Sequence, residues 1–388
     1  MSGSRGRRRR RTARRSVLVV AASVVVAVGT VTGMIKALDD GRGANAARPD
    51  AAGATLLVPL PDVPSTAASA KASGSVSASA KPKKTASPSP TKTGKKQPAA
   101  VFPSLYRHPD SQVLDWVRTH PDDPRTEVIE SRIADRPAAV WFADFTPSTI
   151  TSRVRAVTSG AAAQGRVPVV VPYAIPDRDC GGASEGGASD FDAYDGWIDN
   201  FAAGLGSGEV VVILEPDSIA QADCLSDAQR ADRFAALARA GRVLKAADPK
   251  ARVYYDAGHS DWNPAAQQAA LLREAGAAST ASSDGIFSNV SNFHATSAEI
   301  AYDRQVLDAL DGPVGLGAVI DTSRNGNGAP ADGQWCDPAG RKIGRAPTLN
   351  TGEARIDGYL WVKLPGESDG CKGAAGTFTA SYAYDLAR

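Results

Sequence analysis

The segment "VVVILEPDSIAQADC", residues 210–224, passes from a run of aliphatic residues directly to two carboxylates, Glu215 and Asp217, with a proline between them. A short apolar run bounded by turn-forming residues is typical of a strand that is buried on both faces. Pro216 has no backbone N–H to donate, so the strand must end before it. The segment therefore predicts a buried parallel strand with acidic side chains at its carboxyl end.

Short β-rich segments of this kind recur through the second part of the chain. The others span residues 139–144, 166–173, 252–256, 285–292, 315–321 and 358–364. Amphipathic stretches separate most of them, at residues 148–165, 192–206, 226–248 and 297–310. This alternation predicts an α/β fold with a mostly parallel sheet covered by helices. About seven strands in one domain of this size favour a distorted, incomplete β/α barrel similar to a TIM barrel.

Acidic residues and tryptophans follow several of these predicted strands. The acids are Asp179, Glu215, Asp217, Asp256, Glu367 and Asp369. One acid after a strand is usually a solvated loop residue, but the carboxyl ends of parallel strands share one edge, where active sites of β/α folds lie. Several carboxylates, with no evident histidine base, suggest glycoside hydrolysis, which uses one carboxylic acid and one anionic partner.

Tryptophan side chains strengthen this interpretation because their faces stack well on sugar rings. Trp262 and Trp335 lie in predicted loops beside polar residues and are candidates for such stacking. Trp141 lies inside a predicted strand, where core packing and substrate contact are both open. Trp197 lies on a predicted helix and is expected in the core.

The first 100 residues differ in composition from the rest of the chain. They hold 18 Lys and Arg against 4 Asp and Glu, whereas the remainder holds 26 against 38. Residues 1–15, a predicted cytoplasmic basic segment with eight arginines, precede an uncharged apolar stretch at residues 16–35. This order is typical of a signal peptide or a signal-anchor helix rather than a nucleic-acid-binding arm. Residues 36–100, rich in Ala, Ser, Pro and Lys, predict a disordered linker.

All four cysteines lie in the predicted domain over residues 101–388, and none forms a C-x-x-C pair. An even number of cysteines behind an export signal favours two disulfides. We therefore expect an extracellular protein, either secreted or tethered to the outer face of the membrane. The four histidines are scattered and no phosphate-binding loop occurs, so we expect no metal and no cofactor. We also expect the protein to be a monomer.

Six stretches of the domain resemble glycoside hydrolase family 6, the inverting cellulases. They are "PYAIPDRDCGGASEGG" (172–187), "VVVILEPDSIA" (210–220), "YYDAGHSDW" (254–262), "VIDTSRNGNGAP" (319–330), "QWCDPAGRKIG" (334–344) and "WVKLPGESDGC" (361–371). The resemblance extends over nearly all of residues 102–388, and these stretches occur in the order found in that family. The resemblance implies hydrolysis of β-1,4-glucan with inversion of anomeric configuration.

The resemblance also assigns catalytic roles to five residues. It implies that Asp217 is the general acid and that Asp179 raises the pKa of this acid and assists the water network. Asp369 matches the proposed base, which acts directly or through a chain of waters. Tyr173 matches a tyrosine under the distorted sugar ring, and Ser184 matches a serine in a mobile loop that helps to hold the water.

Other matched positions concern substrate binding and covalent structure. The substrate-binding positions implied are Asp256, Trp262, Trp335, Lys363 and Glu367, with Trp141 as a further candidate. The implied disulfides are Cys180–Cys224 and Cys336–Cys371. Glu185, beside the loop serine, departs from the pattern of the family.

The resemblance leaves the mode of action open. The domain is short for this family, and longer covering loops accompany chain-end enzymes, so an open cleft and attack on internal bonds are favoured over chain-end action. A hydrolase of another β-glucan and a non-catalytic glucan-binding surface protein remain alternatives. Relative activities on a panel of glucans and xylan distinguish a cellulase from a hydrolase of another β-glucan. Turnover of a soluble glucan distinguishes an enzyme from a non-catalytic binding protein.

Overall fold

The computed structural model describes residues 103–388. The predicted basic segment 1–15, the apolar segment 16–35 and the linker 36–100 lie outside the described residues. Within residues 103–388, no helix has both the length and the apolar character that a membrane span requires.

Seven strands form one sheet in the order in which they occur along the chain, and every neighbouring pair is parallel. They are β1 (Val140–Phe142), β2 (Val169–Pro172), β3 (Val210–Leu214), β4 (Ala251–Asp256), β5 (Gly285–Ser288), β6 (Gly317–Asp321) and β7 (Ile356–Leu360). All seven lie within or overlap the strands predicted from the sequence. The last one ends four residues earlier than predicted, because the backbone N–H groups of Val362 and Lys363 donate to the carboxylate of Asp321 instead of to a neighbouring strand.

The sheet curls into an incomplete barrel, as the sequence predicted. β1 and β7 are its edges and share no strand ladder. A backbone hydrogen bond of 2.9 Å from Ala139 N to Trp361 O joins these edges. The indole of Trp141 donates to Val362 O at 2.7 Å and bridges the same gap. The opening between the two edge strands therefore lies next to several of the predicted site residues.

Both faces of the sheet are buried, which explains the continuous apolar runs of its strands. In β3, Val211 and Ile213 belong to the core inside the barrel. Val210, Val212 and Leu214 belong to the core between the sheet and the helices. Because side chains of a strand alternate between its two faces, one apolar pentapeptide fills both cores.

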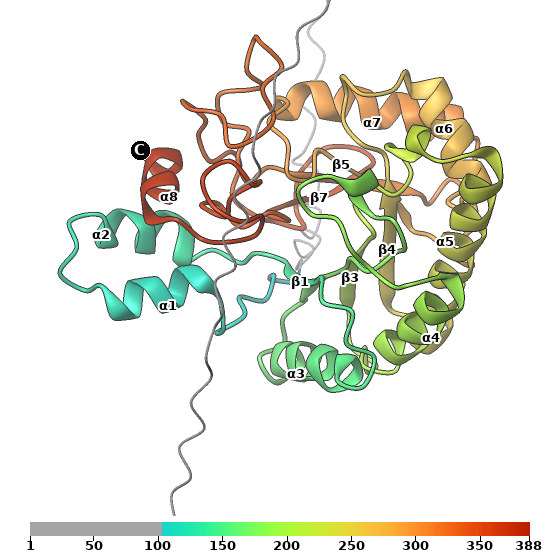
Figure 1. Ribbon diagram of the computed structural model, residues 1–388, viewed down its shortest axis with the longest axis horizontal. Helices are drawn as coiled ribbons and strands as arrows, with labels where there is room; N and C mark the ends of the chain where they lie inside the picture. The colour runs from blue at the N-terminus through green and yellow to red at the C-terminus, as the bar shows by residue number, and fades with distance from the viewer. Residues whose placement is uncertain (1–102) are drawn as a thin grey trace, which may run out of the picture. The chain divides into compact units, whose positions relative to one another are not determined.

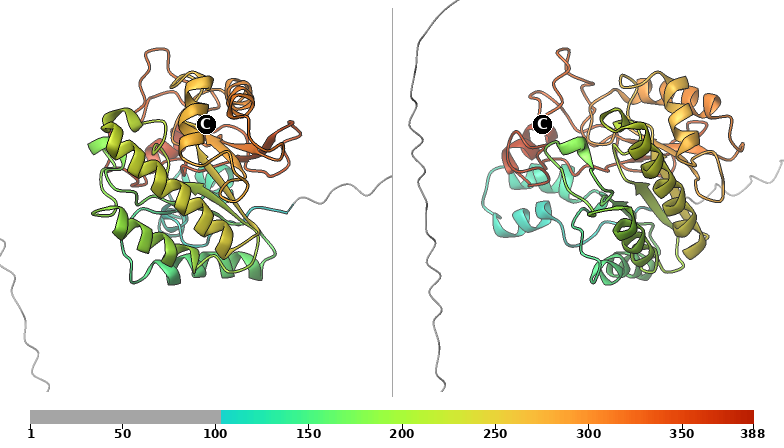
Figure 2. Two further views of the ribbon diagram at one scale, coloured as in Figure 1. Left: turned by 90° about the vertical axis from the view of Figure 1, so that its right-hand side faces the viewer. Right: turned by 45° about the vertical axis from the view of Figure 1, so that its right-hand side comes forward.

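Five helices cover the outer face of the sheet (Figure 1). They are α3 (Ile150–Ala163), α4 (Phe191–Ala202), α5 (Asp227–Ala247), α6 (Ala265–Glu274) and α7 (Thr296–Leu310). Figure 2 shows α4 and α5 side by side on this outer face. The sequence predicted four of the five; α6 was not predicted. Trp197, on α4, is fully buried in the core, as expected.

The remaining helices pack near the opening of the barrel. They are α1 (Gln112–Thr119), α2 (Thr126–Ile129), the π-helical turn η1 (Glu130–Ala134) and α8 (Ala380–Ala387), and two 3₁₀ turns, η2 (Asp179–Gly181) and η3 (Ala222–Cys224), lie in loops. Figure 1 shows α1, α2 and α8 together on the side away from α4 and α5. They share a third small core that includes Trp361 and Leu364. This core supports the segment that follows β7.

A pair of buried acids on α7 binds the loop after β4 and the end of β5. Glu299 and Asp303 are 0 % exposed and are four residues apart, so they share one face of the helix. Glu299 accepts a hydrogen bond from Ser260 N at 3.0 Å, and Asp303 accepts one from Ser288 Oγ at 3.1 Å. Within residues 103–388, neither acid forms an ion pair. Burial raises the pKa of Glu299, and burial together with Glu299 raises that of Asp303.

These raised pKa values predict a stability that falls as the pH rises. A carboxyl with a higher pKa in the folded state stabilises the fold fully below its unfolded pKa, and this contribution is lost as the pH rises through the folded pKa. Glu299→Gln removes one of the two charges and keeps the acceptor for Ser260. We expect the variant to be more stable than the parent at pH 8, because it removes a buried negative charge whose pKa burial raises. At pH 4 we expect little difference.

Chemical denaturation at both pH values measures this effect. The control is Glu274→Gln, which changes an exposed acid at the end of α6. If Glu299→Gln and the control show the same pH dependence as the parent, the buried pair does not exchange protons on unfolding.

Candidate active site

A cavity of about 1230 Å³ lies at the carboxyl edge of the sheet. Its wall includes residues from the loops after β1, β2, β3, β4, β5, β6 and β7. The predicted site residues that line it are Trp141, Tyr173, Asp179, Ser184, Asp217, Trp262, Trp335, Lys363, Glu367 and Asp369. Thus the fold brings together residues that are up to 228 positions apart in the sequence.

A strained turn at the end of β3 carries Asp217. Glu215 and Asp217 adopt left-handed backbone conformations, with φ of 48° and 68°, on either side of Pro216. Such conformations are costly for residues other than glycine and persist where the surroundings hold them. The Glu215 carboxylate supplies such a hold, since it accepts hydrogen bonds from Ala174 N at 2.9 Å and Ile175 N at 3.1 Å. Glu215 therefore has a structural role: its hydrogen bonds connect the end of β3 to the segment after β2.

The environment of Asp217 favours its protonated form. Burial is the largest cause that raises its pKa well above the usual range, followed by the carboxylates of Asp256 and Asp179. Lys363 acts in the opposite direction. A carboxylic acid in such surroundings can hold a proton near neutral pH and donate it.

Asp256 lies behind the cavity rather than on its wall. It is 1 % exposed and is not among the residues that line the cavity. Its carboxylate accepts hydrogen bonds from the backbone N–H groups of Ile219, Ala220 and Gly258 at 2.8–3.1 Å. The sequence interpretation placed Asp256 in contact with substrate. The structure instead gives it two other effects: it holds the segment after Asp217, and it raises the pKa of that acid.

Asp179, Ser184 and Tyr173 form a hydrogen-bonded chain on one side of the cavity. Asp179 accepts from Ser184 N at 2.7 Å and from Ser184 Oγ at 2.9 Å. Because the serine hydroxyl donates to Asp179, the contact of 3.1 Å with Tyr173 is made by the tyrosine O–H as donor. Arg178 supports this arrangement by donating to Ser184 O at 2.8 Å and by lying over the Tyr173 ring at 4.6 Å.

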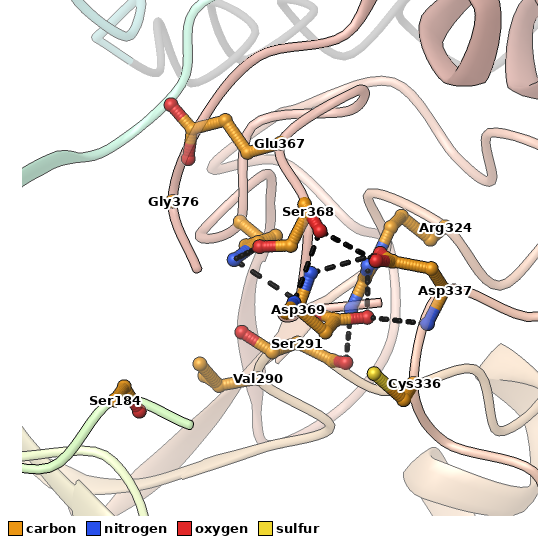
Figure 3. Close-up of polar contacts among 12 residues, drawn as sticks. Ser184, Val290, Ser291, Arg324, Cys336, Asp337, Glu367, Ser368, Asp369 and Gly376 are labelled. Carbon is orange, nitrogen blue, oxygen red and sulfur yellow. Dashed lines mark hydrogen bonds and ion pairs between the residues drawn. The ribbon is translucent and has the colours of Figure 1, made fainter. Parts of the chain in front are cut away.

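Asp369 lies on the cavity wall within a charged network (Figure 3). Arg324, which is completely buried, donates to Asp369 Oδ2 at 2.7 Å. Lys363 Nζ lies 3.7 Å from Asp369 Oδ1 and donates to Ser368 O at 3.1 Å. A buried guanidinium remains charged, so the carboxylate of Asp369 balances it.

The aromatic candidates line the cavity in different ways. Trp141 is half-buried and meets the Tyr173 ring edge-on, with 5.3 Å between the ring centroids. Trp262 is half-buried beside His259, with ring centroids 5.2 Å apart. Trp335 is 59 % exposed, although it lines the cavity, which leaves much of its ring surface free for a ligand.

A residue of helix α1 binds the Glu367 carboxyl group. Gln112, at the start of α1, donates to Glu367 Oε1 at 3.1 Å and to Gly376 O at 2.7 Å. Burial raises the pKa of Glu367 to about 7, and Lys363 opposes this shift. Gln112 thus connects α1 to the segment that follows β7.

Two disulfides have the pairing implied by the family resemblance. Cys180–Cys224 joins the loop of Asp179 to the segment that follows Asp217. Cys336–Cys371 joins the loop of Trp335 to the loop of Asp369. The two bridged regions also approach each other, since a methyl group at Gly370 would lie 3.0 Å from the Ala183 Cβ.

Several residues of this site were absent from the sequence predictions. They are Arg178, Glu215 in its bridging role, Arg324, Asp337 and Gln112. Arg178 and Arg324 lie within stretches already singled out, and an arginine next to acidic loops was a usable signal. Gln112 carried no signal, because its partners lie more than 250 residues away in the sequence.

Comparisons with known proteins identify the family of this chain. The model of the family "Glycosyl hydrolases family 6" matches residues 100–387. Endoglucanase 1 of Streptomyces sp. (strain KSM-9) is 52 % identical over 284 residues, which are 73 % of this chain and 77 % of that protein. Endoglucanase A of Thermobispora bispora is 48 % identical over 75 % of this chain, which spans only 63 % of that protein.

A solved structure is similar as well. The endoglucanase Cel6 from Mycobacterium tuberculosis, in complex with methyl-cellobiosyl-4-deoxy-4-thio-β-D-cellobioside, has a TM-score of 0.68 and 40 % identity. The match covers 73 % of this chain and 96 % of that one. The chain therefore belongs to glycosyl hydrolase family 6 and is a glycosidase.

Proposed function

We propose that this protein hydrolyses internal β-1,4-glucosidic bonds of cellulose or a related β-glucan with inversion of configuration. The observation that carries the proposal is that two different carboxyl groups lie on one cavity wall. Asp217 is desolvated and lies near other carboxylates, whereas Asp369 forms an ion pair with Arg324. Relatives named endoglucanases, at 48–52 % identity, support cellulose as the substrate class.

In the proposed mechanism, the two carboxyl groups move protons in opposite directions. Asp217 gives its proton to the glycosidic oxygen as the bond to the anomeric carbon breaks. Water attacks the opposite face of the sugar, and its proton passes to Asp369, directly or through another water. Asp217 leaves the step as a carboxylate and Asp369 as a carboxylic acid, so charge and protons balance.

The remaining cavity residues orient the sugar and the water. Tyr173 and Ser184 form a hydrogen-bonded chain that ends on Asp179, which suits them to hold water and a distorted ring between the two carboxyl groups. Trp262 and Trp335 offer faces for sugar rings, since aromatic rings bury large areas at little entropic cost. Lys363 and Glu367 supply charged groups for sugar hydroxyls along the same wall.

Chain-end action is the second candidate, and one observation favours it. The close approach of Ala183 to Gly370 brings together loops from opposite sides of the site, which is how a cleft becomes a tunnel. Cleavage of internal bonds lowers the viscosity of soluble glucan early, whereas chain-end cleavage releases sugar with little change in viscosity. The ratio of viscosity loss to new reducing ends therefore separates the two modes.

The two disulfides fit an oxidising environment outside the cytoplasm. We infer that the catalytic domain works there, either secreted or tethered through residues 16–35. Phase partitioning of the expressed full-length chain, with N-terminal sequencing of the mature form, distinguishes a cleaved leader from an anchor.

Product stereochemistry tests the proposed reaction. We expect carboxymethylcellulose and mixed-linkage β-glucan to be cleaved, xylan to be poor, and the α-anomer of the new reducing end to appear first. The reason is that a single displacement by water inverts a β-linkage. Proton NMR of fresh hydrolysate, before mutarotation, measures the anomer. Early accumulation of the β-anomer contradicts the mechanism, and a lack of turnover on every soluble glucan contradicts the enzymatic role.

A further inference from the structure

Asp337 and Asp369 exchange hydrogen bonds across two loops. Asp369 N donates to Asp337 Oδ1 at 2.8 Å, and Asp337 N donates to Asp369 Oδ2 at 3.1 Å. Each aspartate thus accepts a hydrogen bond from the backbone of the other, as Figure 3 shows. Asp337 has a left-handed backbone, with φ of 46°, and is only 4 % exposed.

The second oxygen of Asp337 organises the rest of the loop that carries Asp369. Asp337 Oδ2 accepts from Ser368 Oγ at 2.6 Å, from Lys372 N at 2.8 Å and from Cys371 N at 3.0 Å. Although burial alone raises the pKa of Asp337, the hydrogen bonds from Ser368 and from this backbone lower it overall. The carboxylate is therefore a stable anionic centre around which residues 368–372 fold.

This contact also determines which oxygen of Asp369 is available. Asp369 Oδ2 already accepts from Arg324 and from Asp337 N. Among residues 103–388, the one polar partner of Asp369 Oδ1 is Lys363 Nζ, at 3.7 Å. Since two donors occupy Oδ2, Oδ1 is the oxygen that remains free to accept a proton from water.

The neighbouring disulfide cannot fix this orientation by itself. Cys336–Cys371 sets the separation of the two loops, with 5.8 Å between the Cα atoms. The side chain of Asp369 can still rotate about its own bonds, because the bridge is two residues away from it. The paired contacts with Asp337 act on Asp369 itself, on its backbone N–H and on its carboxylate.

We propose that Asp337 is a positioning residue that orients Asp369, with Oδ2 held and Oδ1 directed to the attacking water. The inference rests on the proposed function, in which Asp369 takes the proton of that water. Asp337 does not line the cavity and has no direct role toward substrate. Its effect on the rate must therefore pass through Asp369.

Asp337→Asn is the sharpest test of the reciprocal contact. With the amide oxygen in the position of Oδ2, asparagine keeps the acceptor for Ser368, Cys371 and Lys372. Its NH₂ group then faces Asp369 N, where a donor meets a donor. We expect kcat to fall by about 10- to 100-fold, the effect of a small misplacement of a reacting group, with KM little changed. We also expect the acid limb of the pH profile to shift, since that limb reports the base.

A double-mutant cycle with Asp369→Asn separates positioning from a general loss of structure. In the Asp369→Asn background, Asp337→Asn should change kcat by less than about twofold, because the group that it orients is gone. The control is Asp332→Asn, which alters an exposed acid in the same loop without touching residues 368–372. Thermal unfolding and thiol titration check that each variant is folded and keeps the disulfide. If Asp337→Asn does not fold, Asp337→Glu serves in its place, since it displaces the carboxylate by one methylene.

The outcomes separate this inference from the proposed function. An equal loss of kcat in both backgrounds, or no loss in either, overturns the positioning role and leaves the mechanism in place. If Asp369→Asn alone retains the parental kcat, Asp369 is not the base, and the proposed mechanism fails together with the inference. A loss of kcat from Asp337→Asn in the parental background, but not in the Asp369→Asn background, supports the positioning role of Asp337.

Discussion

Asp217→Ala should lower the rate of hydrolysis of unactivated β-1,4-glucan by about two to four orders of magnitude, the usual contribution of a general acid. The side chain is the only group on the cavity wall for which burial and three carboxylates together raise the pKa well above its usual range. Because the acid must be protonated to act, activity normally falls as the pH rises through this pKa. The variant should lose that alkaline limb.

The leaving group gives a second readout for the same variant. A dinitrophenyl β-cellobioside releases a phenolate that needs no proton, so Asp217→Ala should hydrolyse it at a rate near that of the parent. Asp223→Asn, in the exposed turn after Asp217, is the matched control and should leave both rates unchanged. Near-parental cleavage of glucan by Asp217→Ala would falsify the assignment of the acid.

The strand pattern of this fold was predictable because each strand is buried on both faces. A segment such as residues 210–214 must be apolar throughout, and its carboxyl end must turn where Pro216 removes a donor. Helix α6, "AAQQAALLRE", escaped prediction because its 10 residues offer fewer helical turns in which a periodic pattern can show than the 12–21 residues of the four predicted helices. The end of β7 depends on the carboxylate of Asp321, which no local pattern reveals.

The site shows the same division between local and long-range information. Asp179, Asp217 and Asp369 lie in loops that follow strands, so their place at the carboxyl edge of the sheet follows from topology. Asp256 is instead the last residue of β4, and its carboxylate turns inward because three backbone N–H groups bind it. Asp337 gains its importance only through contacts with residues 368–372, more than 30 positions away. Such contacts are set by tertiary structure and leave no periodic signal.

Asp369→Asn should also lower kcat by about two to four orders of magnitude. The loss should depend on the leaving group and on pH in the opposite way to the loss in Asp217→Ala. The amide cannot take a proton from water, whichever leaving group departs. The loss should therefore persist on the dinitrophenyl substrate, on which Asp217→Ala is spared. A base must be deprotonated to act, so the acid limb of the pH profile should flatten while the alkaline limb remains.

Asparagine is the right replacement because Arg324 is buried against this carboxylate. Removing the side chain leaves a guanidinium without a partner, which typically destabilises a protein by about 3–5 kcal/mol. The amide oxygen of asparagine can still accept from Arg324 and from Asp337 N, so the variant tests proton transfer more than folding. Denaturant unfolding of the variant checks this distinction. A variant that is folded, active on the dinitrophenyl substrate and impaired only on glucan would show that Asp369 assists the leaving group instead of the water, and the two carboxyl roles would have to be exchanged.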